Sequence, residues 1–164
     1  MQADGVIGQY AIGGAVGAML YLEPAATLDV DIFVNLPVAP GTSLLTLTPI
    51  YDYLKVRGSS MQHEHIVIAG WPVQFLAPRD NLEREAVAEA VPTAVDGVST
   101  RVISAEHLVA IALHTGRSKD HIRIVQFLEQ NAESCEKLDR VLERHGLTLK
   151  WKQFAAKYLE ERHE

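Results

Sequence analysis

The sequence contains a single cysteine, Cys135, among its 164 residues. One cysteine cannot form an internal disulfide, and the seven histidines show no spacing typical of a zinc site. A chain of this length can bury roughly two-thirds of the surface that its unfolded form exposes, so neither a disulfide nor a structural metal is needed to hold the fold. The cysteine content therefore favours a reducing compartment, and we expect a cytoplasmic protein.

Long hydrophobic runs and an excess of basic residues are also absent. The apolar run from Tyr10 to Leu22 ends at Glu23-Pro24, well short of the about 20 residues that a membrane-spanning helix needs. No basic leader with an apolar centre begins the chain, so we expect no secretory signal and no membrane partner. The net charge of -6 argues against nonspecific binding of nucleic acid over a wide surface, although it leaves room for a local basic cleft.

Two aspartates stand in an otherwise apolar stretch near the N-terminus. The pattern there predicts a strand over 9–12, a turn at Gly13-Gly14, a helix over 15–22 and a strand over 29–34. Because side chains alternate along a strand, Asp29 and Asp31 point to the same face, roughly 6 to 7 Å apart. Carboxylates in such a strand are costly unless positive charge or hydrogen bonds meet them. This pair therefore requires an explanation.

The rest of the chain predicts a mixed α/β core followed by helices. The expected elements are a helix from Thr48-Pro49 to Gly58, a hairpin over 65–68 and 72–76, a helix over 82–90, a strand over 98–103, and helices over 105–115, 120–130, 134–145 and 148 to the C-terminus. No linker or repeat interrupts them. We expect a single domain over 1–164, with an α/β (α+β) core over about 1–103 and a helical part over about 104–164.

Three interpretations of the glycines and aspartates are open. In the first, Gly13-Gly14 is a tight turn and the aspartates face solvent, but two like charges on one strand face repel each other. In the second, "AIGGAVGA" begins a dinucleotide-binding unit, but the G-x-G-x-x-G spacing is missing and Pro24 shortens the helix. The third interpretation is metal-dependent nucleotidyl transfer.

The third interpretation explains both features together. Glycine amides at the start of a helix can approach phosphate oxygens closely because glycine has no Cβ. An Asp-x-Asp pair on the adjacent strand supplies the oxygen ligands that Mg²⁺ prefers, and a metal there would neutralise charge on the α-phosphate. The aspartates would then be tolerated because a cation joins them.

Two segments also resemble a known family. "IGGAVGAMLYLEPAATLDVDIFV" resembles the signature of the polymerase β-like nucleotidyltransferase superfamily, and Thr27 fits its common Thr-x-Asp-x-Asp form. "TRVISAEHLVAIALHTGRSKDHIRI" is similar to a segment of small bacterial members, including AbiEii-like toxins of type IV toxin–antitoxin systems. The resemblance implies a nucleotidyltransferase-like mixed sheet flanked by helices, with a helical C-terminal segment.

The resemblance also implies a set of functional residues. It assigns Asp29 and Asp31 to catalysis and to Mg²⁺, and it assigns nucleotide binding to residues that include two basic side chains: Gly13, Gly14, Thr27, Arg117 and Lys119. The expected partners are a nucleoside triphosphate, an unidentified acceptor hydroxyl on RNA or protein, and a cognate antitoxin protein. The implied reaction moves a nucleoside monophosphate onto that hydroxyl.

One position departs from the family pattern. Where such enzymes carry a third carboxylate on a later strand, this chain has Gln74, whose amide cannot act as a base at neutral pH. Glu64 lies nearby in sequence and could substitute for it, although we interpret it as an exposed hairpin residue. The alternative function is therefore a noncatalytic nucleotide-binding or interaction module with a degenerate site. His107 and His114 could reach a cleft, but we interpret them as partly buried and hydrogen-bonded.

Overall fold

The computed structural model describes residues 1–23, 26–37, 46–130 and 135–159. Its strands are β1 (Tyr10–Ile12), β2 (Val30–Val34), β3 (Ser60–Gln62), β4 (His65–Ile68), β5 (Trp71–Leu76), β6 (Val91–Val95) and β7 (Val98–Val102). Its helices are α1 (Gly14–Ala18), α2 (Thr48–Lys55), α3 (Asn81–Ala88), α4 (Ala105–Thr115), α5 (Ser118–Gln130), α6 (Cys135–Arg144) and α7 (Thr148–Tyr158). None of the described helices is long and apolar enough to cross a membrane.

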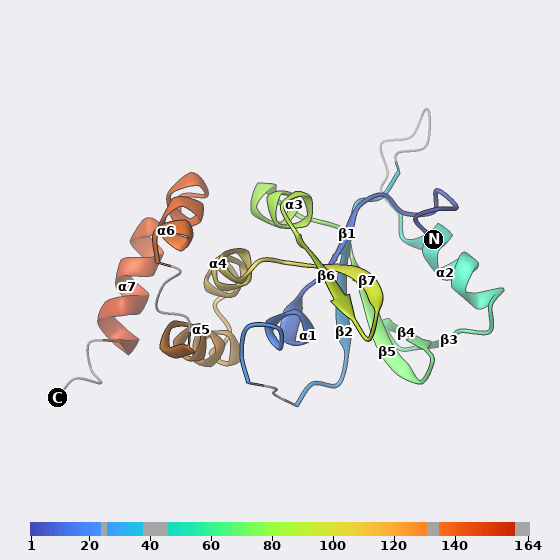
Figure 1. The fold of residues 1–164 in the computed structure, drawn as a ribbon, viewed down its shortest axis with the longest axis horizontal. Helices are drawn as coiled ribbons and strands as arrows, with labels where there is room; N and C mark the ends of the chain where they lie inside the picture. The colour runs from blue at the N-terminus through green and yellow to red at the C-terminus, as the bar shows by residue number, and fades with distance from the viewer. Residues whose placement is uncertain (24–25, 38–45, 131–134, 160–164) are drawn as a thin grey trace.

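The strands form one mixed sheet in the order β3-β4-β5-β2-β1-β7-β6 (Figure 1). β2 lies at its centre, antiparallel to β1 and parallel to β5, and β1 runs parallel to β7. The strand pairs β4–β5 and β6–β7 are antiparallel hairpins on the two sides of this centre. The aspartate-bearing strand is therefore covered by a neighbour on each edge.

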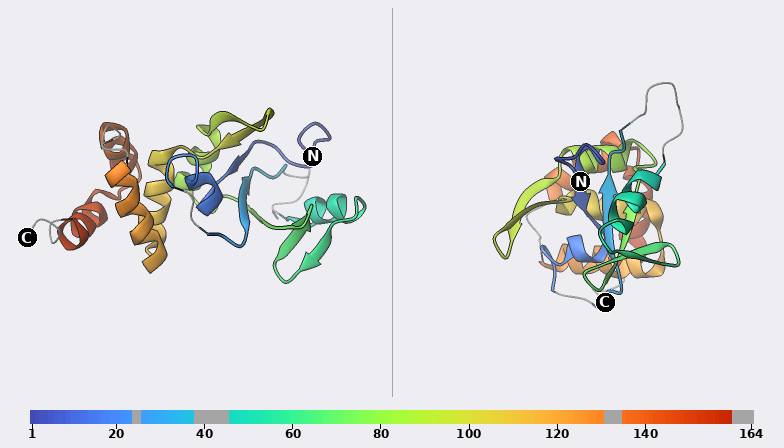
Figure 2. Two further views of the ribbon diagram at one scale, coloured as in Figure 1. Left: turned by 60° about the horizontal axis from the view of Figure 1, so that its bottom comes forward. Right: turned by 90° about the vertical axis from the view of Figure 1, so that its right-hand side faces the viewer.

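Helices cover both faces of the sheet, and β2 separates its side chains between them as its alternation predicts. Phe33 packs with Ala18 of α1, Val87 of α3 and Leu108 of α4 in one apolar cluster. Val34 packs instead in the cluster of Ile50 and Leu54 from α2. Figure 2 shows α2 with β3, β4 and β5 at the end of the molecule opposite α5, α6 and α7. The aspartates share the Phe33 face, where α1, α3 and α4 lie.

The four C-terminal helices pack around a core of their own. Leu113 of α4, Ile124 and Phe127 of α5, Leu142 of α6 and Phe154 of α7 belong to one buried cluster. The aromatic stripe of α7 contributes to this core, since Trp151 stacks on Phe154 and the Tyr158 ring packs against Phe154 at a tilt. Helix α4 also contacts α3 and α1, so it joins the helical part to the sheet (Figure 1).

Two strands of the sheet, one at each edge, were not predicted from the sequence. No strand was expected over 91–95; β6 contains Pro92, which is tolerated there because β6 is an edge strand. Asp96-Gly97, with positive φ at both residues, closes its hairpin. β3, the short strand at the other edge, was also missed.

Helix α1 is shorter than the predicted span of 15–22. It ends at Ala18, after which Leu20 and Tyr21 donate to carbonyls three residues back, the tighter pattern of a closing turn. Thr48 was also expected to cap α2, but it is the first helical residue and Leu47 occupies the cap.

Candidate functional site

The turn between β1 and α1 is packed directly against the aspartate strand. The Gly13 N–H donates to the backbone carbonyl of Asp31 over 2.9 Å. A Cβ at Gly13 would lie 2.7 Å from the Phe33 ring, and one at Gly14 would lie 2.8 Å from Cγ of Asp31. Gly14 also has φ of 56°, in the left-handed region. Only glycine therefore fits at both positions.

Asp31 lines a cavity of 240 Å³ together with Gly14 and Phe33. Its carboxylate is half-buried, and none of the residues that the structure describes donates a hydrogen bond to it. Burial, followed by repulsion from Asp29, raises the pKa of Asp31, while Arg117 opposes the shift. The nearby positive charge thus compensates this carboxylate only in part.

Asp29 stands just before β2 and is held by two side chains. The Thr27 hydroxyl donates to the Asp29 carbonyl at 3.2 Å and to its carboxylate at 3.3 Å. His65 of β4 places its Nε2 atom 3.3 Å from Oδ2 of Asp29. Sequence reasoning missed His65, because the contact depends on β4 and β5 lying beside β2 in this register.

Gln74 lies next to Asp31. The parallel register of β2 and β5 pairs Asp31 with Gln74, which puts their backbones about 4.8 Å apart, and both residues line the cavity. The expected neighbour relation is confirmed. Glu64 is exposed in the turn between β3 and β4, as interpreted from the sequence.

Arg117, the residue before α5, also lines the cavity. Its backbone N–H, Nε and Nη2 all donate to Asp120, at 3.2, 2.7 and 3.2 Å. This hydrogen bonding raises the pKa of Arg117. Lys119 is exposed and is not among the cavity-lining residues, although its charge opposes the rise in the pKa of Asp31.

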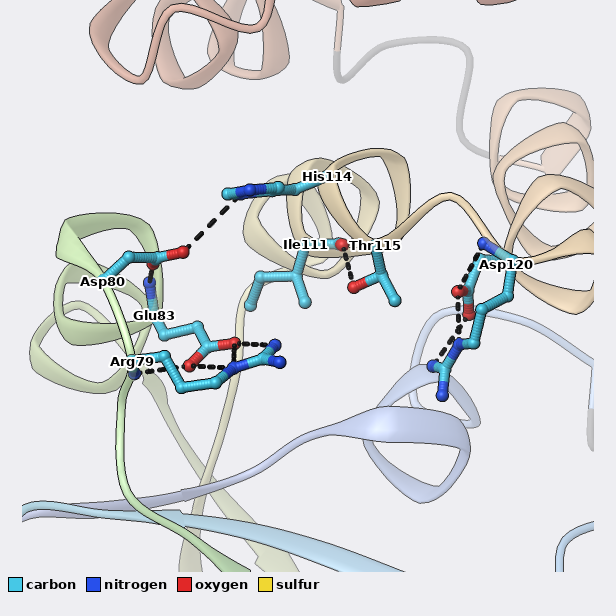
Figure 3. A network of polar contacts seen from close by, with 8 residues as sticks. Arg79, Asp80, Glu83, Ile111, His114, Thr115 and Asp120 are labelled. Atoms are coloured by element: carbon cyan, nitrogen blue, oxygen red, sulfur yellow. Dashed lines mark hydrogen bonds and ion pairs between the residues drawn. The ribbon is translucent and has the colours of Figure 1, made fainter.

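A second arginine, Arg79, lines the same cavity from the start of α3. Its backbone N–H donates to Oε2 of Glu83 at 2.7 Å, and its Nε donates to Oε1 at 3.0 Å. Figure 3 shows this pair on the side of α4 opposite Asp120, with the Arg79 side chain extending toward Asp120. Sequence reasoning did not single out Arg79, since no local pattern shows that α3 and α5 begin at one cavity.

A different carboxylate group joins α3, α4 and the end of α6. Glu85 accepts hydrogen bonds from His107 at 3.2 Å and His145 at 3.1 Å, and it pairs with Arg144 at 3.2 Å. Ligand atoms of Glu85, Glu89 and His107 lie within 4.8 Å of one another, a spacing compatible with a metal ion. Because Glu85 already has three basic partners, we interpret this group as a charge network.

The two histidines of α4 differ from each other. His107 is buried and bonded to Ser104 Oγ through Nδ1 at 2.9 Å, as expected from the sequence. His114 is exposed, and its Nδ1 lies 3.6 Å from Asp80 (Figure 3). Both residues line a neighbouring pocket that shares Arg79 with the Asp31 cavity. Neither histidine touches the two aspartates in the described part of the chain.

Comparison with known proteins identifies the fold. No protein-family model matches the chain, and no curated protein matches its sequence. Among solved structures, the chain is similar to an antigenic nucleotidyltransferase-like protein from Paracoccidioides brasiliensis, with a TM-score of 0.57, 16% identity, and coverage of 92% of this chain and 81% of that chain. It is also similar to the antibiotic-resistance factor ANT(2'')-Ia, with a TM-score of 0.46, 15% identity, and coverage of 95% and 89%.

The first of these similarities, together with the sheet order, defines the class of fold. The protein has a nucleotidyltransferase-like α/β fold, in which a mixed sheet is flanked by helices. At this level of identity the likeness concerns the fold, so the chemistry has to be argued from the residues at the cavity.

Proposed function

We propose that this protein binds a nucleoside triphosphate with Mg²⁺ and transfers its nucleoside monophosphate to an acceptor hydroxyl. The observation that supports this most is Asp31, a half-buried carboxylate without a hydrogen-bond donor among the described residues, on the wall of a cavity that Arg117 also lines. Such a carboxylate is costly to the fold unless a cation joins it.

The donor set fits Mg²⁺. Asp31 of β2 and Asp29, which precedes β2, would supply oxygen ligands, and Thr27 orients the Asp29 carboxylate. When bound, Mg²⁺ would neutralise charge on the phosphates and align the attacking and leaving oxygens. His65 holds the outer side of Asp29, so it acts on the position of this carboxylate.

The glycine turn supports the nucleotide part of the proposal. Gly14 has no Cβ to fill the space beside Asp31, so a phosphate could approach the carboxylate and its metal closely. The Gly13 N–H is already bonded to Asp31, so the predicted contact of Gly13 with triphosphate would use another group. Arg117 would bind phosphate from across the cavity, and Lys119 would add charge at its rim.

The more specific parts of the proposal rest on the sequence resemblance. They are an AbiEii-like type of nucleotidyltransferase, an RNA or protein acceptor, and a cognate antitoxin as partner, whereas the single domain over 1–164 rests on the lack of a linker or repeat in the sequence. The similarity of "GRSKD" and its helix to small bacterial members supports them.

Gln74 favours a second candidate function, a noncatalytic nucleotide-binding module. It occupies the position beside Asp31 where a third carboxylate would accept the proton of the attacking hydroxyl. An amide has no basic lone pair for this proton, so nucleotide binding can persist while transfer is slow.

Pyrophosphate release tests the proposal. The protein is incubated with each labelled triphosphate, Mg²⁺ and a cell extract as the source of acceptor. We expect release that falls about 100-fold or more in Asp29→Ala and Asp31→Ala, because losing a metal ligand removes several kcal/mol of transition-state stabilisation. Asp139→Ala, an exposed aspartate on α6, serves as the control. Binding without release would support the module, and no binding would refute both candidates.

A further inference from the structure

Two arginines at the cavity are held by the same local arrangement. Arg79 precedes α3 and Arg117 precedes α5, and each donates its backbone N–H and two guanidinium nitrogens to one carboxylate, Glu83 or Asp120. Glu83 and Asp120 are 3% and 1% exposed, whereas the arginines are 75% and 58% exposed. A buried carboxylate thus fixes an exposed guanidinium in both places.

This arrangement leaves donors available at the cavity. An arginine has five guanidinium N–H groups, and the Nη1 hydrogens of Arg79 and Arg117 have no acceptor among the described residues. Both side chains line the cavity that contains Asp31 and Gly14. Because the guanidinium groups are already oriented, an oxyanion that binds them loses little side-chain entropy.

The charges around the cavity also leave an excess of positive charge once Asp31 binds Mg²⁺. Arg123 lines the cavity too, and its Nη1 lies 3.8 Å from Asp120, so three arginines share two paired carboxylates. Arg79 and Arg117 are near enough that the positive charge of Arg79 opposes the raised pKa of Arg117. Two fixed guanidinium groups that repel each other across a cavity are stabilised by an anion between them.

We infer that Arg79 and Arg117 form a clamp for the terminal phosphates of the nucleotide, the part that leaves as pyrophosphate. This inference rests on the proposed function and adds Arg79 as a ligand-binding residue. Glu83 and Asp120 are positioning residues, because each fixes the orientation of one guanidinium group by accepting its hydrogen bonds. Lys119, which does not line the cavity, is outside the clamp.

Calorimetric titration of the full chain tests the clamp without requiring turnover. Arg79→Gln and Arg117→Gln should each weaken binding of Mg²⁺–triphosphate about tenfold or more, because each removes charged hydrogen-bond donors to the terminal phosphates. Both should leave the affinity for the nucleoside monophosphate within about twofold, because it lacks the clamped phosphates. Arg84→Gln, an exposed arginine on α3, is the matched control.

Two additional variants keep the test decisive. If Arg79→Gln leaves Glu83 buried without a partner and prevents folding, Arg79→Gln with Glu83→Gln removes both charges together. Arg79→Lys keeps the charge but loses the paired donors, and it should bind triphosphate with an affinity between those of wild type and Arg79→Gln.

The outcomes separate the clamp from the proposed function. Loss of triphosphate binding in Asp31→Ala together with wild-type affinity in the Arg79 variants would overturn the clamp and leave the proposed function standing. A second outcome is that inorganic pyrophosphate binds in a manner that depends on Arg79, whereas no nucleotide binds. This result would support the anion site and overturn the proposed nucleotidyl transfer. Absence of binding by every phosphate compound would overturn both.

Discussion

Asp31 and Glu85 are two partly buried carboxylates with opposite surroundings. Glu85 is met by His107, His145 and Arg144, and although burial opposes its ionisation, these basic groups together lower its pKa. The Asp31 carboxylate has no hydrogen-bond donor among the described residues, and burial and Asp29 raise its pKa. The charge of Glu85 therefore stabilises the folded state, whereas the charge of Asp31 destabilises it.

The difference separates a structural carboxylate from a functional one. Glu85 connects α3 to α4 and to the end of α6, so it helps to hold the helical part against the core. Asp31 makes no such connection and opens onto a cavity. A destabilising charge at a cavity is a common feature of functional sites, where stability is lost in exchange for binding.

The largest stability effect should come from Glu85→Gln. Removing the charge leaves His107 and His145 without their carboxylate, and we expect the free energy of unfolding at neutral pH to fall by about 1–3 kcal/mol. Glu64→Gln, an exposed change in the turn between β3 and β4, should stay within about 0.5 kcal/mol of wild type. Urea denaturation measures both.

The pH dependence sharpens this comparison. The pKa of Glu85 is lowered from 4.5, so its stabilisation is present above pH 4.5 and is lost as the pH falls through the folded-state value. Glu85→Gln should therefore lose less stability than wild type over that acidic window. Equal losses in the two proteins would show that the Glu85 network is not what stabilises the fold.

A smaller effect should follow from adding an acid beside Asp31. Gln74→Asp places a third carboxylate at the position paired with Asp31, where it can accept a proton from the acceptor hydroxyl. We expect pyrophosphate release to rise about tenfold, equivalent to about 1.4 kcal/mol of barrier. Gln126→Asp, an exposed change on α5, is the control. A fall of tenfold or more in Gln74→Asp would show that the third site has been misplaced.

Much of the fold could be predicted from local patterns. The alternation in β2, the hairpin of β4 and β5, and helix α4 with Ser104 at its start and Gly116 at its end all follow from the sequence. The missed strands are the two edge strands: β3 has only three residues, all exposed, and β6 contains Pro92, although Asp96-Gly97 was a hairpin signal.

The site was only partly predictable, because its remaining contacts join distant segments. The glycine turn and the aspartates lie close together in sequence, which is why their relation was expected. His65 reaches Asp29 through the sheet register, and Arg79 reaches the cavity because α3 and α5 begin on either side of α4. Local propensity contains no information on such pairings.

The central claim is that the charge of the Asp31 carboxylate is left only partly compensated so that a divalent cation can bind. The most direct test is the unfolding free energy of Asp31→Asn, measured with and without Mg²⁺. The pKa of Asp31 is raised from 3.8 in the folded state. The folded state therefore loses stability as the pH rises from 3.8 through the raised pKa, and this loss remains at neutral pH. The account predicts that Asp31→Asn is more stable than wild type without Mg²⁺, and that Mg²⁺ stabilises wild type alone. A less stable Asp31→Asn, or equal stabilisation of both proteins by Mg²⁺, would contradict it.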